Sequence, residues 1–361
     1  MTIIMGYTVG IVPIVMGDIL VTRAGASDSM FNKLAFGQMN EEAAAHVSML
    51  RQKVNIINDD MILAWAGNLL QASAAFRHIA DAIERRPAAA EDIGAVIRAI
   101  PEAQRNDLSL IGLIQKSSGF TSFFWHNTLR IPVEVFGNAV IAGTGADYVA
   151  GLAAQLEQKH RRNPHDDDHV SDELRAVLFA MVIAAEAAGL EHFSGANLVD
   201  RWGGAIEVAS FERRRAKKLS DTLYAFWDFQ TEAGGRLELV PKFVKVQYHK
   251  DLLVIFLLSG QGPSREELRF EVDVWGVPPL ISPYQIGSVV HVPHPSFGYD
   301  YLCSQIALKT RTTVHRVNSL VLADKDNLAI RFFRHGQKTA VQVDRDYEMA
   351  IEKFAREMQP H

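Results

Sequence analysis

Apolar positions dominate the start of the chain, where seventeen uncharged residues precede Asp18. The run is rich in Ile, Val and Thr, and Gly10 and Pro13 interrupt it. Short β-branched runs separated by turn residues favour buried strands over a helix. We therefore expect two strands, over residues 2–7 and 11–16, joined by a tight turn.

Hydrophobic periodicity further along alternates between strands and helices. Residues 51–68 read as a hairpin that turns at 58–60, after an insertion with a loop and a short helix. Apolar residues at helical spacing follow at Leu69, Ala72, Phe76, Ile79 and Ile83. A further helix is expected to begin after an N-cap at Ser171 and to end at Gly189, because serine and glycine favour these two positions.

The order of these elements, strands followed by helices and more strands, predicts an α+β fold with antiparallel sheets and helices on their outer faces. The length of 361 residues allows two domains. The basic run at 213–218 is predicted to be a solvated linker, which gives one domain over 1–214 and an accessory α+β domain over 215–361. The second domain shows alternating strands and a closing helix, and carries no catalytic motif.

Composition narrows the class of protein. Hydrophobic content of 48% and charged content of 22% are typical of a globular protein, and a net charge of −5 predicts no nucleic-acid or membrane partner. No Lys or Arg precedes Arg23, so the start lacks the pattern of an export signal, and it is too short for a membrane span. The single cysteine, Cys303, fits a cytoplasmic protein and is expected to be a buried thiol rather than a nucleophile.

Common catalytic templates do not occur in the sequence: there is no G-x-S-x-G elbow, P-loop or zinc-ligand spacing. The stretch "HDDDH" at 165–169 has the residue types of a metal site, but it lies in a polar loop before a helix, where such residues are common. We therefore predict no metal and no organic cofactor.

Thr2 is the remaining candidate nucleophile. A small residue at position 2 favours removal of the initiator Met1, which would leave a threonine at the N-terminus. Such a residue carries both a hydroxyl nucleophile and a base, its own α-amine. The ordinary pKa of an α-amine, about 7.7–8.0, suits general-base catalysis near neutral pH.

The residues after Thr2 resemble, in order and spacing, the motifs of the proteasome-type, threonine-dependent N-terminal nucleophile hydrolases, which include proteasome β subunits and the bacterial peptidase HslV. A Gly-Asp pair at 17–18 lies at the family's distance from Thr2. Lys53 begins "KVNII", like the family lysine that starts a strand, and Gly67 follows at the position of the oxyanion-hole glycine. The resemblance covers residues 2–211.

Later motifs extend the resemblance and also depart from it. Thr22 matches the family threonine that aligns substrate, and Thr144 stands at the serine of a G-[ST]-G turn. In "EHFSGA", Glu191 and Ser194 match a D-x-x-S-G motif, with Glu in place of Asp. The insertion before Lys53 is longer than in the family, and Leu20 replaces a family arginine.

The resemblance implies a four-layer αββα sandwich, assembled into homo-oligomeric rings, and a threonine peptidase that acts on peptides or unfolded proteins, with an ATP-dependent unfoldase as a candidate partner. It implies that Thr2 attacks, Lys53 lowers the pKa of the neighbouring amine or hydroxyl, Asp18 holds Lys53, and Gly67 binds the oxyanion. Lys33, in the inserted loop, is the rival lysine. One alternative is a small-molecule amidohydrolase of the same nucleophile class. The other is an inert ring scaffold, which is favoured by the missing arginine and by the altered Ser and Asp positions of the motifs.

Overall fold

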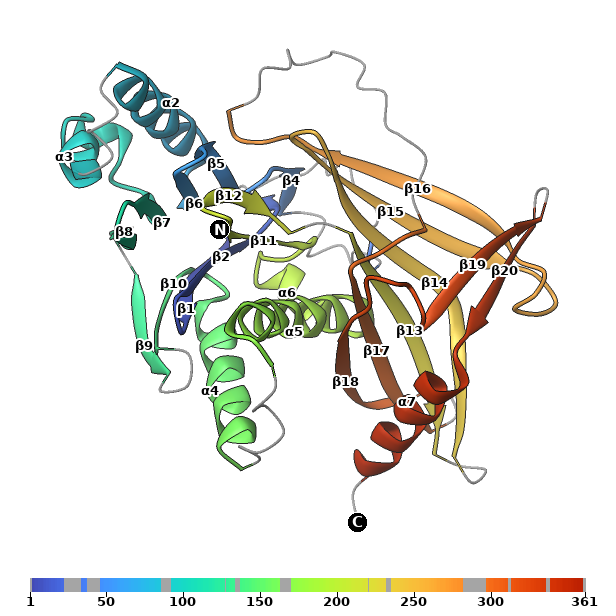
Figure 1. Cartoon of the computed structure of the whole chain (residues 1–361). Coiled ribbons are helices and arrows are strands. Elements are labelled where there is room, and N and C mark those ends of the chain that lie inside the picture. The colour runs from blue at the N-terminus through green and yellow to red at the C-terminus, as the bar shows by residue number, and fades with distance from the viewer. Residues whose placement is uncertain are drawn as a thin grey trace.

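The N-terminal apolar run forms the centre of a six-stranded antiparallel sheet, sheet I, in the computed structural model (Figure 1). β1 and β2 are the two predicted strands, joined by a turn in which Gly10 has a φ of +55°. The strands of sheet I, in spatial order, are β12 (Arg215–Lys218), β11 (Ile206–Glu212), β2 (Val12–Asp18), β1 (Ile3–Val9), β10 (Gly137–Gly143) and β9 (Leu129–Val133). The structure describes residues 2–22, 34–37, 46–85, 92–126, 128–133, 137–162, 170–219, 221–231, 235–281, 297–310, 313–335 and 338–359.

A four-stranded antiparallel sheet, sheet II, packs face to face on sheet I through aliphatic side chains such as Ile4, Val15, Ile62 and Ile111. It contains the predicted hairpin, and its strands are β5 (Val54–Asn58), β6 (Met61–Gly67), β7 (Leu108–Lys116) and β8 (Gly119–Trp125). Its other face is covered by α2 (Leu69–Arg85), which is the predicted amphipathic helix, and by α3 (Ile93–Arg98). The 3₁₀ turn η2 (Glu102–Gln104) contacts α2. A small ribbon of β3 (Leu20–Thr22) and β4 (Val47–Leu50) lies beside them.

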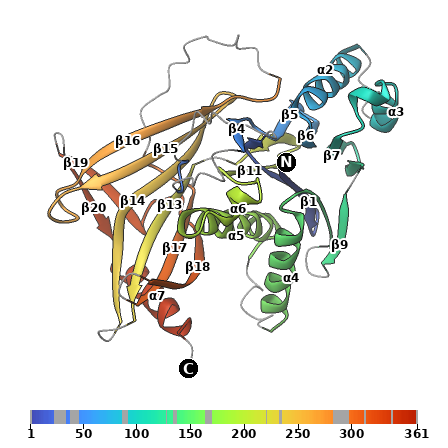
Figure 2. The ribbon, with the colours of Figure 1, turned by 180° about the vertical axis from the view of Figure 1, so that it is seen from behind.

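The C-terminal part of the chain is built on a second six-stranded sheet, sheet III. The strands of sheet III, in spatial order, are β16 (Arg269–Val277), β15 (Leu252–Gln261), β14 (Arg236–His249), β13 (Thr222–Gln230), β17 (Tyr301–Thr310) and β18 (Thr313–Ala323). β13 and β17 are parallel and the other pairs are antiparallel. One face of the sheet packs on α7 (Arg345–Glu357) and on the hairpin of β19 (Ile330–His335) and β20 (Lys338–Val343), as Figure 2 shows from behind.

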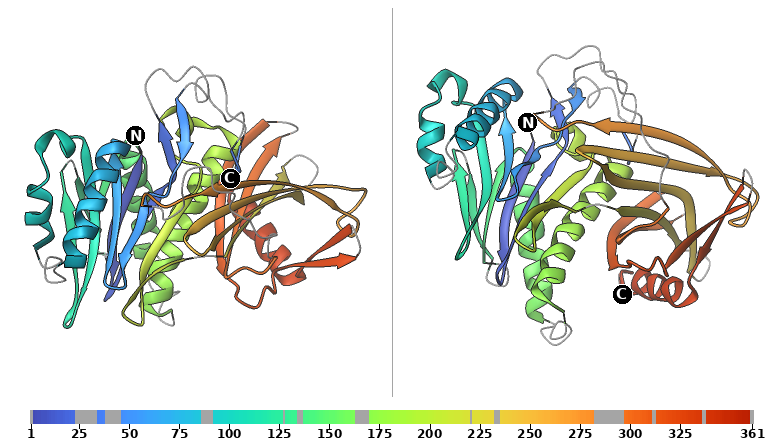
Figure 3. Two further views of the ribbon diagram at one scale, coloured as in Figure 1. Left: turned by 90° about the horizontal axis from the view of Figure 1, so that it is seen from above. Right: turned by 45° about the horizontal axis from the view of Figure 1, so that its top comes forward.

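The opposite face of sheet III packs on helix α5 (Asp172–Phe193), which contacts β17 and β18 on one side and β1 and β2 of sheet I on the other. Figure 3 shows α5, in green, between the blue strands of sheet I and the orange strands of sheet III. α4 (Ala146–Arg162) packs on β9 and β10, and α6 (Ala196–Val199) follows α5. α5 is long and apolar enough to span a membrane, yet two thirds of its most apolar window is buried within the chain.

The expected fold class, a four-layer αββα sandwich with an additional α+β domain, is wrong. Among the described residues, 49% lie in strands and 27% in helices, and the strands form five separate sheets. The physical reason is the position of α5, which is not an outer layer because sheet III covers the face that the prediction left to solvent or to ring contacts. The C-terminal part is likewise mainly β, with α7 as its one helix among the described residues.

Two local predictions are corrected for similar reasons. α5 begins at the predicted N-cap, Ser171, but it runs on past Gly189 to Phe193. Glycine occupies position 189 because sheet III approaches closely there: a Cβ would lie 2.4 Å from Oε1 of Gln305. The basic run predicted as a linker forms β12 at the edge of sheet I, so this sheet ends at Lys218, four residues beyond the expected boundary.

Candidate active site

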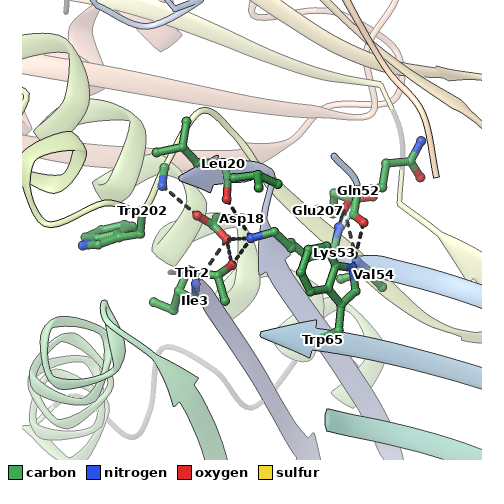
Figure 4. Close-up of polar contacts among 12 residues, drawn as sticks. Thr2, Ile3, Asp18, Leu20, Gln52, Lys53, Val54, Trp65, Trp202 and Glu207 are labelled. Atoms are coloured by element: carbon green, nitrogen blue, oxygen red, sulfur yellow. Dashed lines mark hydrogen bonds and ion pairs between the residues drawn. The ribbon is translucent and has the colours of Figure 1, made fainter. Parts of the chain in front are cut away.

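Three polar side chains from separate segments meet at one end of sheet I (Figure 4). Thr2 directly precedes β1 and Asp18 ends β2, and the antiparallel register, which pairs Ile4 with Gly17, brings them to the same end. Lys53 directly precedes β5 of sheet II. The sequence predicted this cluster, and the structure brings all three residues together.

The contacts within the cluster are direct. The Thr2 hydroxyl donates a hydrogen bond to Oδ1 of Asp18, and the Lys53 ammonium donates one to the Thr2 hydroxyl oxygen. Lys53 Nζ also lies 3.3 Å from Oδ1 of Asp18 and 2.7 Å from the carbonyl oxygen of Leu20. Because Leu20 contributes its backbone oxygen, the replacement of a family arginine at this position does not remove this contact.

The cluster is buried, which governs its electrostatics. Thr2 is 1% exposed, Asp18 0% and Lys53 1%. Burial lowers the pKa of the Lys53 ammonium, and the carboxylates of Asp18 and Glu207 oppose that effect. The ammonium also lies 4.8 Å from the ring centroid of Trp65, a favourable cation–π contact. A charged lysine beside a threonine hydroxyl stabilises the alkoxide form of that hydroxyl.

Asp18 is held by the backbone as well as by the two side chains. Its Oδ1 accepts a hydrogen bond from the Ile3 N–H at 3.1 Å, and its Oδ2 accepts one from the Gly203 N–H at 2.9 Å. Both oxygens of the buried carboxylate therefore have partners. These hydrogen bonds fix the orientation of the carboxylate beside Lys53.

Glu191 supports this arrangement from the C-terminal end of α5. Its Oε2 accepts a hydrogen bond from the N–H of Gly204 at 2.7 Å, next to the glycine that contacts Asp18. Its Oε1 is buried and has no hydrogen-bond partner among the residues that the structure describes. Burial raises the pKa of Glu191 to about 7. In the structure Glu191 contacts the turn behind Asp18, which is the geometry of a positioning residue.

The other predicted site residues lie as follows. Gly67 ends β6 at a φ of +107°, two residues after Trp65. Thr144 follows Gly143, whose position allows close approach to the start of the chain, because a Cβ at 143 would lie 1.8 Å from the Thr2 carbonyl oxygen. Thr22 ends β3, opposite Val47.

Ser194 is exposed and bonded locally. Its hydroxyl donates to the Leu190 carbonyl oxygen at 2.8 Å and accepts from the Ala196 N–H at 3.3 Å, so it connects α5 to α6. Cys303 is buried in β17, as predicted, and burial raises the pKa of its thiol. Lys33 and the 165–169 stretch lie outside the described residues. Within the described ranges, no group of three His, Cys, Asp or Glu side chains is placed to hold a metal ion.

Sequence reasoning missed Glu207 in β11, which is 2% exposed. Its Oε2 accepts hydrogen bonds from the backbone N–H groups of Lys53, at 2.7 Å, and Val54, at 3.2 Å. The available signal was its position in "GAIEVASFE", where apolar residues flank this acid on both sides. Buried acids of this kind require partners, so the pattern marks a polar network.

Comparison with known proteins does not assign the chain to a family. No protein-family model matches the chain, and no curated protein is significantly similar to it in sequence.

Proposed function

We propose that the chain is a threonine-dependent amide hydrolase that cleaves peptides, with Thr2 as its nucleophile. The observation that carries the proposal is the buried contact of the Thr2 hydroxyl with both Lys53 and Asp18. A cation beside a hydroxyl favours its alkoxide form, which supports the use of this hydroxyl as a nucleophile.

The reaction begins once Met1 is removed and the Thr2 amine is free. Thr2 Oγ forms a bond to the carbonyl carbon of the substrate, and the α-amine takes the hydroxyl proton. The same proton then passes to the leaving amine as the C–N bond breaks, which leaves an ester on Thr2. Water cleaves this ester and restores the hydroxyl. Lys53 stabilises the developing alkoxide, and the N–H of Gly67 is the proposed donor to the oxyanion.

A small-molecule amide or lactam is the second candidate substrate. The observation that favours it is the 1% exposure of Thr2, which leaves little room for a polypeptide in the structure as it stands. The inert scaffold has less support, because the nucleophile, lysine and carboxylate retain mutual contacts.

The test examines both the removal of Met1 and the hydrolytic activity. The natively expressed chain is examined by intact-mass measurement, and is then incubated with a panel of fluorogenic peptides, with small amides, and with an electrophilic acylating probe. We expect a chain that starts at Thr2, turnover of the peptides, and a probe adduct that maps to Thr2. Thr2→Ala should abolish turnover and labelling, whereas Thr2→Ser should retain part of both.

Two results would contradict the proposal. One is an active protein with Met1 fully retained, because the amine would then be one residue away from the hydroxyl. The other is turnover that Thr2→Ala leaves unchanged. Turnover of small amides without turnover of peptides would select the second substrate class.

A further inference from the structure

The short segment that carries Lys53 is held mainly by residues far from it in sequence. The Gln52 N–H donates to the carbonyl oxygen of Pro278 at 3.1 Å. The Gln52 side-chain amide donates to the carbonyl oxygens of Asp251 and Val277, each at 2.6 Å. On the other side of Lys53, the Leu280 N–H donates to Oδ1 of Asn55 at 2.9 Å. Strand ends and loops of sheet III therefore contact the lysine segment on both sides.

Glu207 is the centre of this arrangement. One of its oxygens accepts from the N–H groups of Lys53 and Val54, as described above. The other accepts from Lys218 Nζ at 2.7 Å and from the Tyr248 hydroxyl at 2.8 Å. Lys218 also donates to Oε1 of Gln52. The carboxylate thus joins the lysine segment to β12 of sheet I and to β14 of sheet III.

This network differs from the reacting cluster in position and in surroundings. Glu207 contacts the backbone of Lys53, whereas Thr2 and Asp18 contact its ammonium. Beside the network lies a cavity of about 470 Å³, whose lining includes Gln52, Lys218 and Tyr248. A buried polar network in which each donor and acceptor has a partner holds its members in one geometry.

We propose that Glu207 is a positioning residue for Lys53, and that Tyr248 of sheet III holds Glu207 in place, so that the C-terminal part of the chain sets the position of the catalytic lysine. The inference rests on the proposed function for its kinetic consequence, but the geometry can be tested without turnover. It also changes the role of residues 215–361 from an accessory unit to a support of the site.

The charges around Lys53 give the direction of a pH effect. The groups that face its ammonium or lie next to its backbone are Thr2, Asp18, Trp65 and Glu207, with Lys218 beyond Glu207. Because Glu207 raises the pKa of Lys53, Glu207→Gln should lower that pKa and move the alkaline limit of kcat to lower pH. Tyr248→Phe keeps the charge and removes one hydrogen bond, so it should leave that limit in place.

The experiment measures kcat, KM and the pH profile of kcat for three variants of the full chain. We expect kcat to fall about tenfold in Glu207→Gln with little change in KM, the size typical of residues that orient a functional group. Tyr248→Phe should lower kcat in the same direction by a smaller factor. The matched control is Tyr347→Phe, another buried tyrosine of the C-terminal part, whose hydroxyl bonds Ser304 instead. It should leave kcat and the pH profile unchanged.

A second readout separates this inference from the proposed function. The chain is labelled with ¹³C at lysine Cε, and the Lys53 signal, assigned by its loss in Lys53→Gln, is titrated by NMR. A lower Lys53 pKa in Glu207→Gln supports the inference even where no peptide is cleaved, in which case the proposed function fails alone. The inference is overturned if Tyr248→Phe and Glu207→Gln both match the parent in kcat and in the Lys53 titration while cleavage remains dependent on Thr2. If Glu207→Gln does not fold, the kcat of Tyr248→Phe is compared with that of Tyr347→Phe. A lower kcat in Tyr248→Phe alone supports the inference, and equal values overturn it.

Discussion

Replacement of Glu191 by glutamine should make the protein less sensitive to pH. Glu191 is 2% exposed, its Oε1 accepts no hydrogen bond within the described part of the chain, and burial raises its pKa to about 7 from an ordinary value of 4.5. Between these two values the folded protein holds a proton on Glu191 that the unfolded chain has released. The free energy of unfolding therefore falls as the pH rises from about 4.5 to about 7, and is level above that range.

The magnitude follows from the shift. A difference of about 2.5 pKa units, at about 1.4 kcal/mol per unit, corresponds to roughly 3 to 4 kcal/mol of stability lost across that range. Glu191→Gln keeps an oxygen that can accept the Gly204 N–H and carries no charge at any of these pH values. The variant should thus gain stability relative to the parent as the pH rises.

The assay is urea unfolding of the parent and the variant at pH 5, 6, 7 and 8, with the difference between their free energies of unfolding plotted against pH. Contributions from other titrating groups cancel in this difference. Glu173→Gln is the matched control, because Glu173 lies in the exposed first turn of the same helix. A difference for Glu191→Gln that stays constant from pH 5 to 8, or that moves in favour of the parent, would refute the reasoning.

Further expected outcomes concern the site and the assembly. Lys53→Ala should abolish hydrolysis in the fluorogenic peptide assay, and Lys33→Ala should not; the reverse result would show that the wrong lysine was chosen. Gly203→Ala should lower the unfolding midpoint in urea, since a φ of +128° and a Cβ only 2.4 Å from Asn197 Nδ2 cost about 1–3 kcal/mol or more. Truncation after Lys218 should give insoluble protein in an expression test, because it uncovers the apolar face of α5; a soluble, active fragment would contradict this. The homo-oligomeric ring that the resemblance implies is tested by light scattering, and a 40 kDa monomer at micromolar concentration would count against it, as does the cover of sheet III over the α5 face expected at the ring contacts.

The sequence predicted the parts of the fold that depend on local signals. A charge-free β-branched run gave β1 and β2, helical spacing gave α2, and a serine before two acids gave the start of α5. The contact of Asp18 with Lys53 was also predictable, because a lone carboxylate after an apolar run needs a partner and Lys53 starts the next apolar strand. The family resemblance implied that Thr2 joins this pair.

What could not be predicted depends on contacts between distant segments. α5 is apolar around most of its circumference, a pattern that indicates burial on more than one side without saying what covers it. The partner is sheet III, whose first strand starts at Thr222, well after the helix ends at Phe193. The role of Gly189 could not be predicted for the same reason. Glycine often ends a helix, but here it allows the close approach of Gln305. Glu207 was missed because its partners come from three separate parts of the chain.

Two sets of hydrogen bonds therefore connect sheet III to the cluster of Thr2, Asp18 and Lys53. On one side, Gln305 donates to the Ala185 carbonyl oxygen of α5 at 2.7 Å, and the same helix carries Glu191 to the turn that contacts Asp18. On the other side, Tyr248 contacts Glu207, which bonds the backbone of Lys53. The carboxylate and the ammonium that flank the Thr2 hydroxyl are thus each positioned through residues that depend on the C-terminal part. A change in the packing of sheet III would alter both charged groups together, so the environment of Thr2, the proposed nucleophile, depends on the whole chain rather than on its first 214 residues.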